Sequence, residues 1–421
     1  MRRELLRTVI LEWQTSKEIK PNIPRKLFVD LNAAIQSEQI VVITGVRRCG
    51  KSILLQHIRQ QQKENHYYLN FGDERLVNFT VDDFQMMMEL FIELFGEQKT
   101  AYFDEIQNIP SWERFVRRLY ENDYKIFITG SNANMLSQEM GTHLTGRYIK
   151  IELYPFSYYE FLTFKNIELD VQRVTTAKKA KLNQMMKEYI LTGGFPQYVK
   201  EKMLEHLQSL YESVLYRDII TRYKLPNEQT IKQLAFYFAS NIGKEITYNS
   251  LKKHLNLGAS NTVSDYCQYL ENAYLFFLVK RFSFSLKQQS NSPKKVYAID
   301  TGLANAIGFR SSDDAGRMLE NIVFIELKRK NYDIYYHNEK KECDFVVCKQ
   351  NKIRELIQVC FDLSDLETRE REINGLVDAM NDYKITSGTI VTLAETDEIN
   401  MSHQGKKIKI KVIPIWLWLA N

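Results

Sequence analysis

The sequence predicts an α/β protein, and three observations support this fold class. Short apolar runs alternate with helical stretches between residues 39 and 155. A long helical segment follows from about 156 to 238, and mixed strands and helices return after residue 318. Short β runs that are separated by helices favour parallel strands joined by right-handed crossovers, which form a layered α/β fold.

The composition is that of a globular protein. The 421 residues allow two or three domains at roughly 150 residues per domain. Hydrophobic residues make up 44% and charged residues 26%, which excludes a chain that is mainly disordered or collagen-like. The formal net charge of +5 is mildly basic, so it permits a nucleic-acid partner without requiring one.

The sequence indicates neither a membrane segment nor a secretory leader. No apolar run approaches the roughly 18–20 residues that a membrane helix needs, and Glu4, Arg7 and Glu12 interrupt the first apolar stretch. The five cysteines are scattered and lack the paired C-x-x-C spacing. We therefore expect a cytoplasmic protein with reduced thiols, no membrane partner and no zinc site.

The elements of the first part follow from the same patterns. Residues 1–35 predict one or two short helices with a break at Pro21–Pro24. Strands are expected at 40–44, 66–71, 100–105, 124–130 and 148–154. Helices such as SILLQHIRQQQ and SWERFVRRLYEN lie between them, which is typical of parallel β-α-β units.

A phosphate-binding loop follows the first strand. The segment GVRRCGKS fits the pattern GxxxxGK[ST], and it lies between an apolar strand and a helix, as this motif requires. Glycines let the backbone N–H groups wrap around phosphates, and the start of the next helix favours an anion. Lys51 is expected to reach the β and γ phosphates of ATP, and Ser52 to bind Mg²⁺. Arg47 and Arg48 could instead face a neighbouring chain or DNA. The predicted nucleotide-binding residues are Gly45, Val46, Arg47, Arg48, Cys49, Gly50, Lys51 and Ser52.

Two adjacent acids, Asp104 and Glu105, end the strand expected at 100–105. An acid at the carboxyl end of a parallel strand can reach the metal beside a phosphate loop. We predict that Asp104 helps to bind Mg²⁺ and that Glu105 is the general base for the attacking water; the alternative is an ordinary acidic strand end. Residues 66–71 suggest an additional strand inserted between the two motifs, which favours ATP-hydrolysing P-loop machines over the kinase–GTPase branch.

Two further residues are catalytic candidates. Ser131 follows the strand expected at 124–130, where a polar side chain could sense the γ-phosphate; Asn132 is the second choice, and a plain helix cap is the alternative. Arg147 precedes the strand at 148–154. Phosphoryl transfer gains from a cation delivered by a neighbouring subunit, so Arg147 is predicted to be such an arginine finger. The alternative for Arg147 is a solvated side chain.

Four segments together show a resemblance to a known family. The segments GVRRCGKS, YFDEIQN, ITGSNANML and LTGRYIKIELYPFSYYEF resemble the AAA+ ATPases of bacteria and archaea that carry a poorly characterised C-terminal region. The helical stretch with GGFPQYV and LYRDII is similar to the lid segment of those proteins. The resemblance covers nearly the whole chain, and it implies a helical lid and assembly into a ring or partial ring.

A helix–turn–helix is expected after the lid. Thr247 can cap a short helix, and a turn at 256–258 leads into a second helix and a strand pair, the pattern of a winged helix. Lysines give salt-sensitive binding to DNA backbone, whereas Asp265 and the absence of arginine weaken the case for base readout. The alternative is a packing or oligomerisation module. The expected DNA-facing residues are Ser260, Asn261, Thr262, Ser264, Lys244, Lys252, Lys253, His254 and, on a wing tip within 286–295, Lys287, Lys294 and Lys295.

The C-terminal pattern of one helix, three strands, a helix and a strand resembles the restriction-endonuclease-like core. That resemblance matches Glu320 to the helix acid and Asp344 to the strand acid of a Mg²⁺ site. The E-x-K position, however, reads Gln358-Val359-Cys360. An amide lacks the negative charge that Mg²⁺ requires, and a neutral thiol does not replace an ammonium. We therefore expect a degenerate nuclease fold that serves DNA binding or assembly.

The sequence thus predicts four parts: a P-loop AAA+ core with N-terminal helices (1–160), a helical lid (161–238), a winged helix-turn-helix (239–300) and an inactive nuclease-like α/β domain (301–421). The predicted function is Mg²⁺-dependent ATP hydrolysis by a homo-oligomer, coupled to DNA binding, translocation or remodelling. The alternative is a nucleotide-dependent signalling switch whose C-terminal domains bind a protein partner.

Overall fold

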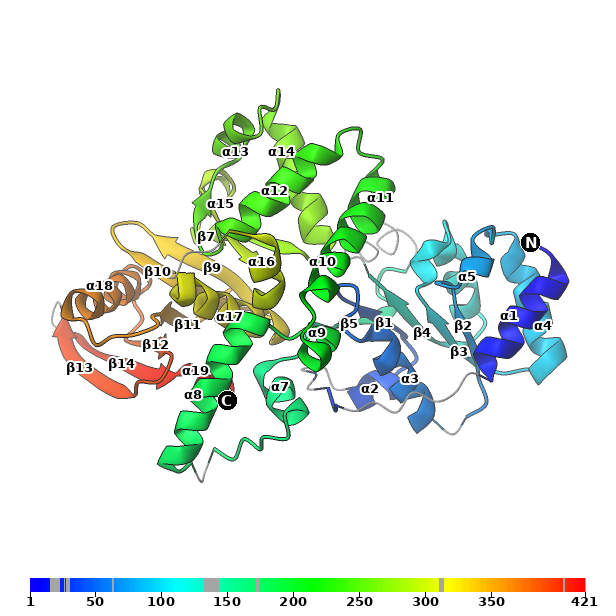
Figure 1. The fold of residues 1–421 in the computed structure, drawn as a ribbon, viewed down its shortest axis with the longest axis horizontal. Helices are drawn as coiled ribbons and strands as arrows, with labels where there is room; N and C mark the ends of the chain where they lie inside the picture. Colours follow the sequence, from blue (N-terminus) through cyan, green and yellow to red (C-terminus); the bar gives the residue numbers. More distant parts are fainter. Residues whose placement is uncertain are drawn as a thin grey trace. The chain divides into compact units, whose positions relative to one another are not determined.

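The computed structural model describes residues 1–15, 23–25, 27, 31–62, 64–131, 144–171, 174–309, 314–403 and 406–420 (Figure 1). The chain divides into two compact units. Unit 1 is Met1–Tyr154 together with Asn272–Tyr274, and unit 2 is Pro155–Glu271 together with Leu275–Asn421. The helical segment expected as a lid therefore lies in unit 2.

Unit 1 contains the predicted parallel sheet. Its strands, within the described part of the chain, are β1 (Ile40–Thr44), β2 (Tyr67–Asn70), β3 (Thr100–Asp104), β4 (Lys125–Gly130) and β5 (Tyr148–Glu152). They pair in the order β2-β3-β4-β1-β5, and every pair is parallel. All five strands lie at the positions that the sequence predicted.

The strand that separates the two motif strands is not the one that we expected. β4 lies between β1 and β3, whereas β2, formed by part of 66–71, is at the edge of the sheet. The order of strands along the chain does not fix their order in a parallel sheet, because a crossover helix can pass over a neighbouring position. The expectation of an inserted strand is confirmed, but its assignment to 66–71 is wrong.

Helices surround this sheet (Figure 1). They are α1 (Arg3–Gln14), α2 (Leu31–Gln36), α3 (Lys51–Gln61), α4 (Asp83–Phe95) and α5 (Trp112–Tyr120). Helix α3 packs across β1, β3 and β4, and α1 packs on α4 and β2. Leu6, Val9 and Ile10 of α1 are spaced as one apolar stripe and are fully buried in the core. The packing fixes the strand ends that carry the predicted site.

Unit 2 contains a mixed sheet, which over the described residues has nine strands in the order β13-β14-β12-β11-β10-β9-β7-β8-β6. The strands are β6 (Glu245–Ile246), β7 (Phe276–Arg281), β8 (Lys294–Ala298), β9 (Asp333–Asn338), β10 (Glu342–Lys349), β11 (Lys352–Val359), β12 (Ser387–Thr392), β13 (Asp397–His403) and β14 (Lys406–Pro414). The parallel pair β7–β9 joins the strands of the expected winged region to those of the expected nuclease-like region. The two regions therefore share one sheet.

The helices of unit 2 fall largely where apolar spacing predicted them. They are α7 (Tyr158–Phe164), α8 (Thr176–Thr192), α9 (Pro196–Glu201), α10 (Leu204–Ser213), a π-helical stretch (Val214–Ile220), α11 (Thr221–Tyr223), α12 (Glu228–Ser240), α13 (Tyr248–His254), α14 (Ser260–Asn272), α16 (Thr301–Ile307), α17 (Ala315–Arg329) and α18 (Leu366–Tyr383). Helix α18 packs on β10, β11 and β12. In the part of the chain that is described, no helix has both the length and the hydropathy of a bilayer-crossing segment.

Three elements of unit 2 differ from the expectation. Helix α15 (Leu286–Asn291) occupies the polar stretch that we expected to be a loop, and the mainly polar edge strand β13 was missed. The apolar run at 410–419 favours one strand, but its residues 415–418 form helix α19 (Ile415–Trp418). A short apolar run does not distinguish a buried strand from a buried helix, which explains the last error.

Candidate functional site

The phosphate loop joins β1 to α3 and depends on its glycines. Gly45 has a φ of 147°, and a Cβ there would lie 2.0 Å from the carbonyl oxygen of Leu153. Gly50, directly before α3, has a φ of 103°. Both backbone conformations are accessible to glycine and strained for other residues. The loop therefore keeps the open backbone cradle that phosphate binding requires.

The side chains of the loop differ in what they can contribute. Val46 and Cys49 are fully buried, so only their backbone groups can meet a phosphate. Burial raises the pKa of the Cys49 thiol, which therefore stays neutral. Arg47 and Ser52 are half-buried, and Arg48 is exposed with a φ of 60°.

An arginine that the sequence did not single out braces the loop. Arg25 Nη1 donates a hydrogen bond of 2.7 Å to the carbonyl oxygen of Cys49, and its Nη2 donates one of 2.6 Å to the carbonyl oxygen of Tyr154. The residue precedes α2 in a segment without apolar periodicity, so no sequence pattern indicated this role.

Lys51 lies over the loop and faces the acids. Its side chain is buried, and Nζ donates to the carbonyl oxygens of Gly45 and Val46, both at 3.1 Å. The same ammonium lies 3.8 Å from Oε1 of Glu105. A single cation is thereby placed between the loop and the end of β3, as predicted for a phosphate ligand.

Asp104 is fully buried at the end of β3. Its Oδ1 accepts a hydrogen bond from the Thr129 hydroxyl, whereas Oδ2 has no hydrogen-bond partner among the described residues. Burial and the charge of Glu105 raise the pKa of Asp104 to about 6, against the lowering effect of the Thr129 and Ser52 hydroxyls and of Lys51. A buried carboxylate oxygen without a partner fits the oxygen ligands that Mg²⁺ prefers.

Thr129 fixes both acids and was missed by the sequence reasoning. Its Oγ1 donates to Asp104 and accepts the backbone N–H of Glu105 at 2.9 Å. Phe103 pairs with Ile128 in the β3–β4 register, so Thr129 follows opposite Asp104. The signal was available: carboxyl ends of neighbouring parallel strands meet at one edge of a sheet.

Gln107 joins the two predicted catalytic side chains, and it too was missed. Its Nε2 donates to the carboxylate of Glu105 and, at 3.3 Å, to the hydroxyl of Ser131. Its Oε1 is buried and lacks a hydrogen-bond partner within the described ranges. Glu105, Gln107 and Ser131 thus form one polar cluster at the end of the sheet. Asn132, the second choice, lies outside the described residues.

Arg147 is the one predicted catalytic residue that the structure does not bring to this cluster. Its carbonyl oxygen accepts the N–H of Ile40 at 2.9 Å, so it lies at the amino end of β1, whereas the loop follows the carboxyl end. Five strand residues separate the two edges by about 16 Å. Its guanidinium lies 3.5 Å from Glu121. A role at a neighbouring subunit's site stays a prediction.

The nuclease-like positions come together in unit 2, but with a lysine that we did not expect. Lys295 of β8 places Nζ 3.0 Å from Oε1 of Glu320 and 2.8 Å from Oδ1 of Asp344. The sequence pattern assigned no ammonium to these acids, because the E-x-K spacing cannot show a lysine that is contributed by another strand.

This second cluster is buried and internally satisfied. Oδ2 of Asp344 accepts the N–H of Val359 at 2.9 Å, and Gln358 donates to Glu372. Burial and the charge of Asp344 raise the pKa of Glu320. Burial opposes the charge on Lys295, but the surrounding acids raise its pKa overall. Lys295 thus supplies the positive charge at the centre of these acids.

The expected wing tip is also corrected. Lys294 and Lys295 are only 8% and 1% exposed, because strand β8 begins at Lys294. Lys294 Nζ donates to the carbonyl oxygen of Ser290 at 3.1 Å, and burial lowers its pKa. These two lysines are therefore not available to DNA, whereas Lys287 is exposed on α15.

The helix–turn–helix residues occupy α13 and α14. Lys244, Lys253 and His254 are exposed, and Lys252 is half-buried. On α14, Asn261 and Asp265 are exposed, so an acid lies on its outer face. Ser260, Thr262 and Ser264 are half-buried.

Comparisons with known proteins cover both units. Residues 37–162 match the family described as an AAA domain, and residues 183–314 match a domain family of unknown function (DUF8612). An uncharacterised protein of Methanocaldococcus jannaschii is 35% identical over 405 residues, which cover 92% of this chain and 90% of that protein. An uncharacterised protein of Haemophilus influenzae is 34% identical over 383 residues, which cover 86% of this chain and 92% of that protein.

Among solved structures, the Walker-type ATPase of Pyrococcus abyssi aligns with 66% of this chain and 93% of its own, at 15% identity and a TM-score of 0.43. The AAA domain match includes the phosphate loop, Asp104, Glu105 and Ser131. The two uncharacterised relatives match along most of the chain, and therefore extend beyond that domain.

Proposed function

The chain belongs to the AAA+ P-loop ATPases, in one family with the Methanocaldococcus jannaschii and Haemophilus influenzae proteins, and from this premise we propose that it hydrolyses Mg²⁺-ATP in unit 1. The observation that carries the proposal is the set of groups at the sheet edge. Lys51, the unpartnered oxygen of Asp104 and the carboxylate of Glu105 all lie beside the glycine cradle.

In this proposal Ser52 and Asp104 would bind Mg²⁺. The ion neutralises charge on the β and γ phosphates. The backbone of Gly45–Ser52 wraps around the phosphates, and Lys51 exchanges its loop carbonyls for phosphate oxygens. Glu105 takes the proton of the attacking water as general base.

Gln107 has a positioning role in the same proposal. Its amide N–H groups hold the Glu105 carboxylate and the Ser131 hydroxyl, and its buried carbonyl oxygen faces no protein donor among the described residues. We expect that oxygen to accept a hydrogen bond from the attacking water. Ser131 would contact the γ-phosphate and, through Gln107, the Glu105 carboxylate, so that the base is positioned when the phosphate is bound.

The direct test is ATP binding and phosphate release by the full chain and by Lys51→Ala. The variant should lose nucleotide affinity, because the phosphates lose their main cation. Lys99→Ala is the control, because it removes a surface lysine that donates to the carbonyl oxygen of Asn122 and lies over the Tyr124 ring. Equal affinity in Lys51→Ala and wild type would refute the proposed site.

We further propose that hydrolysis is coupled to DNA. Helices α13 and α14 with strands β7 and β8 follow the order of a winged helix, and exposed cations on that region would meet phosphates. ATP turnover should rise with duplex, forked or single-stranded DNA, and the rise should diminish with salt. The double variant Lys244→Ala/Lys253→Ala should reduce the stimulation, whereas Lys99→Ala should not.

A nucleotide-dependent switch that binds a protein partner is the second candidate. The burial of Lys294 and Lys295 and the acid Asp265 on the outer face of α14 favour it. DNA that neither binds in a salt-sensitive way nor stimulates turnover would reject the DNA proposal and favour this switch.

Assembly into a homo-oligomer is a separate proposal, in which Arg147 completes a neighbour's site. Arg147→Ala and Lys51→Ala should each be inactive. Mixing them should restore part of the activity, because some sites then combine Lys51 of one subunit with Arg147 of another. A monomer with and without ATP, or a mixture without activity, would remove this role.

A further inference from the structure

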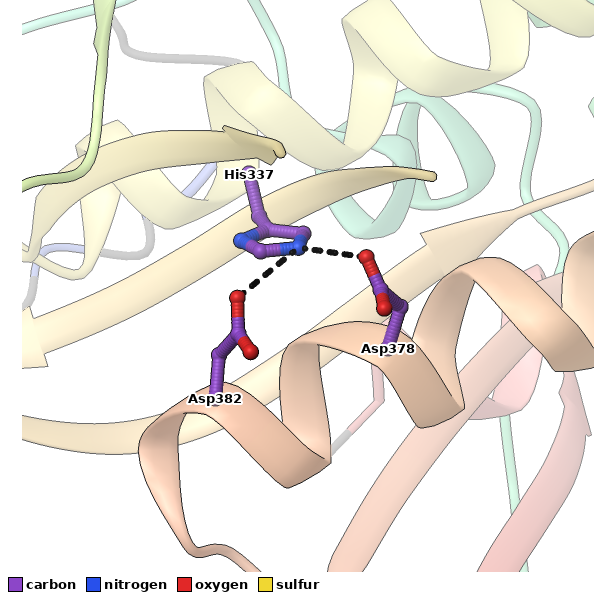
Figure 2. Close-up of side chains that lie close together, drawn as sticks. All are labelled: His337, Asp378 and Asp382. Atoms are coloured by element: carbon purple, nitrogen blue, oxygen red, sulfur yellow. Dashed lines mark hydrogen bonds and ion pairs between the residues drawn. The ribbon is translucent and has the colours of Figure 1, made fainter. Parts of the chain in front are cut away.

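A mixed cluster of one imidazole and two carboxylates lies in unit 2, apart from every group used above. His337 is on β9, and Asp378 and Asp382 are on α18. Figure 2 shows both carboxylates directed toward the same ring nitrogen of His337. That nitrogen, Nε2, is 3.2 Å from Oδ2 of Asp378 and 3.9 Å from Oδ2 of Asp382.

The spacing suits a single ion. The three donor atoms lie within 4.8 Å of one another. Zinc bonds of 2.0–2.2 Å in tetrahedral geometry place neighbouring ligand atoms about 3.3 Å apart. A small inward movement of the Asp382 side chain, which is 45% exposed, would close the remaining gap.

The charges also favour a cation. Asp378 and Asp382 are four residues apart on one helix face, where like charges destabilise the helix. They lie in the last turns of α18, whose carboxyl end is itself the negative end of the helix dipole. Oδ2 of Asp378 accepts the backbone N–H of Lys341 at 3.0 Å, which orients the carboxylate toward the cluster. The carboxylate is therefore ready to bind.

The imidazole is oriented by a contact at Nδ1, the ring nitrogen that does not face the two carboxylates. His337 is 1% exposed, and its Nδ1 lies 2.8 Å from the hydroxyl of Tyr383. The phenol oxygen of Tyr383 can accept the Nδ1–H. A second partner that fixes the ring and leaves the other nitrogen for the ion is typical of metal-binding histidines.

We propose that His337, Asp378 and Asp382 bind one divalent transition-metal ion, of which Zn²⁺ is the best match. Imidazole nitrogen together with carboxylate oxygen suits zinc and cobalt, whereas Mg²⁺ prefers oxygen alone. The exposure of Asp382 leaves room for water as a further ligand. The bound ion ties the β9–β10 hairpin to the last turns of α18.

The three ligands form no local motif in the sequence. The expectation of no zinc site rested on the cysteine spacing. Here the ligands are a histidine and two aspartates, and the histidine is 41 positions from Asp378. Only the fold brings them together.

The test uses the full chain, freed of metal with a chelator and kept without nucleotide. Zn²⁺, Co²⁺ and Mg²⁺ are titrated while metal content, calorimetric binding and the thermal unfolding midpoint are measured. We expect one Zn²⁺ per chain, a higher midpoint with Zn²⁺, visible absorption from bound Co²⁺ and no such effects with Mg²⁺. Asp382→Asn, at a half-exposed position, should fold normally and bind Zn²⁺ at least tenfold more weakly.

His337→Gln should show the same loss, and Glu370→Gln, an exposed acid on the same helix, should bind as wild type does. Absence of stoichiometric Zn²⁺ in wild type would mean that the cluster is an ion pair only and would overturn the proposal. Zn²⁺ binding that is unchanged in both Asp382→Asn and His337→Gln would overturn it as well. Neither result bears on ATP hydrolysis.

Discussion

Two clusters of this protein each place a buried lysine beside acids, yet they differ in how fully their atoms are used. In unit 1, Lys51 lies 3.8 Å from Glu105, and one oxygen of Asp104 has no partner among the described residues. In unit 2, Lys295 Nζ lies 3.0 Å from Oε1 of Glu320 and 2.8 Å from Oδ1 of Asp344, and it is also ion-paired with Glu342. Both oxygens of Asp344 are thus paired within the second cluster, whereas an oxygen of Asp104 in the first remains open to a ligand.

The difference separates a stabilising network from a reactive site. Buried polar groups are normally paired, so an unpaired buried oxygen is either a cost in stability or a ligand position. Among the described residues, Asp104 and Gln107 each have such an oxygen, whereas both carboxylate oxygens of Asp344 accept hydrogen bonds. From their residue types alone, the two clusters would be equally good candidates for a catalytic site.

The largest expected effect concerns the general base of unit 1. Glu105→Gln should bind ATP as wild type does and lower kcat by about 10²–10⁴-fold, because the amide cannot take a proton from water. Phosphate release and nucleotide binding are measured in parallel. Glu113→Gln, on α5, is the control. Normal turnover in Glu105→Gln would show that the unit 1 cluster does not supply the general base, and it would then no longer differ from the unit 2 cluster as a reactive site.

Exchanging each lysine for methionine compares the clusters directly. Lys295→Met leaves Glu320 and Asp344 buried without a counter-charge and should lower the free energy of unfolding by about 3–5 kcal/mol. Lys51→Met should change it by less than about 1 kcal/mol, because the neighbouring acids retain their Thr129 and Gln107 partners. Urea unfolding of both variants is the measurement. A stable Lys295→Met protein would contradict the structural role of that cluster.

If the unit 2 cluster is structural only, the chain should not cut DNA. Plasmid incubated with the protein and Mg²⁺ or Mn²⁺ should remain intact. Cleavage that is abolished by Asp344→Ala would show that the satisfied network can open and act as a nuclease.

Gln107 tests whether the unpaired oxygen of unit 1 matters. Gln107→Ala should reduce kcat by about 10–100-fold while KM and ATP affinity change little. It should also weaken trapping of ADP with aluminium fluoride, which imitates the transferring phosphoryl group. A parallel change in ATP affinity and kcat would instead indicate a merely structural side chain.

The smallest effect is a pH dependence at Asp104. Its pKa of about 6 in the folded protein is above the ordinary 3.8. As the pH falls through 6 the carboxyl becomes protonated, and Mg²⁺-ATP affinity should fall about tenfold by pH 5.

The stability should change with the opposite sign. Raising the pH above 3.8 ionises Asp104 more readily in the unfolded chain than in the folded one, so the ionised group destabilises the fold. Asp104→Asn should therefore be more stable than wild type at pH 8 by about 1–3 kcal/mol, with a smaller difference near pH 4. An equal difference at both pH values would contradict the raised pKa.

Much of unit 1 was predictable, because its signals are local. The five strands, the glycine loop and the acids at the end of β3 follow from apolar runs and a motif. Thr129 was also within reach, because parallel strand ends share an edge. Gln107 and Arg25 could not be predicted in this way. Gln107 lies in the turn after β3 and Arg25 in a segment without apolar periodicity, so only the fold shows which groups their side chains reach.

Unit 2 shows the limit of such reasoning. Glu320 and Asp344 were found from the order of elements, but Lys295 was assigned to a wing tip because a polar run of glutamine, serine and lysine is typical of a loop. The run instead ends in a strand that places its lysine inside the core. Contacts between residues that are far apart in sequence leave no periodic trace.

Glu105 has a φ of 52°, in the left-handed region that suits glycine. A side chain in that conformation raises the energy of the fold by about 1 kcal/mol. Glu105→Gly should consequently melt no earlier than wild type even though it abolishes turnover. The backbone at this position is therefore set by where the carboxylate must point and not by what would make the fold most stable.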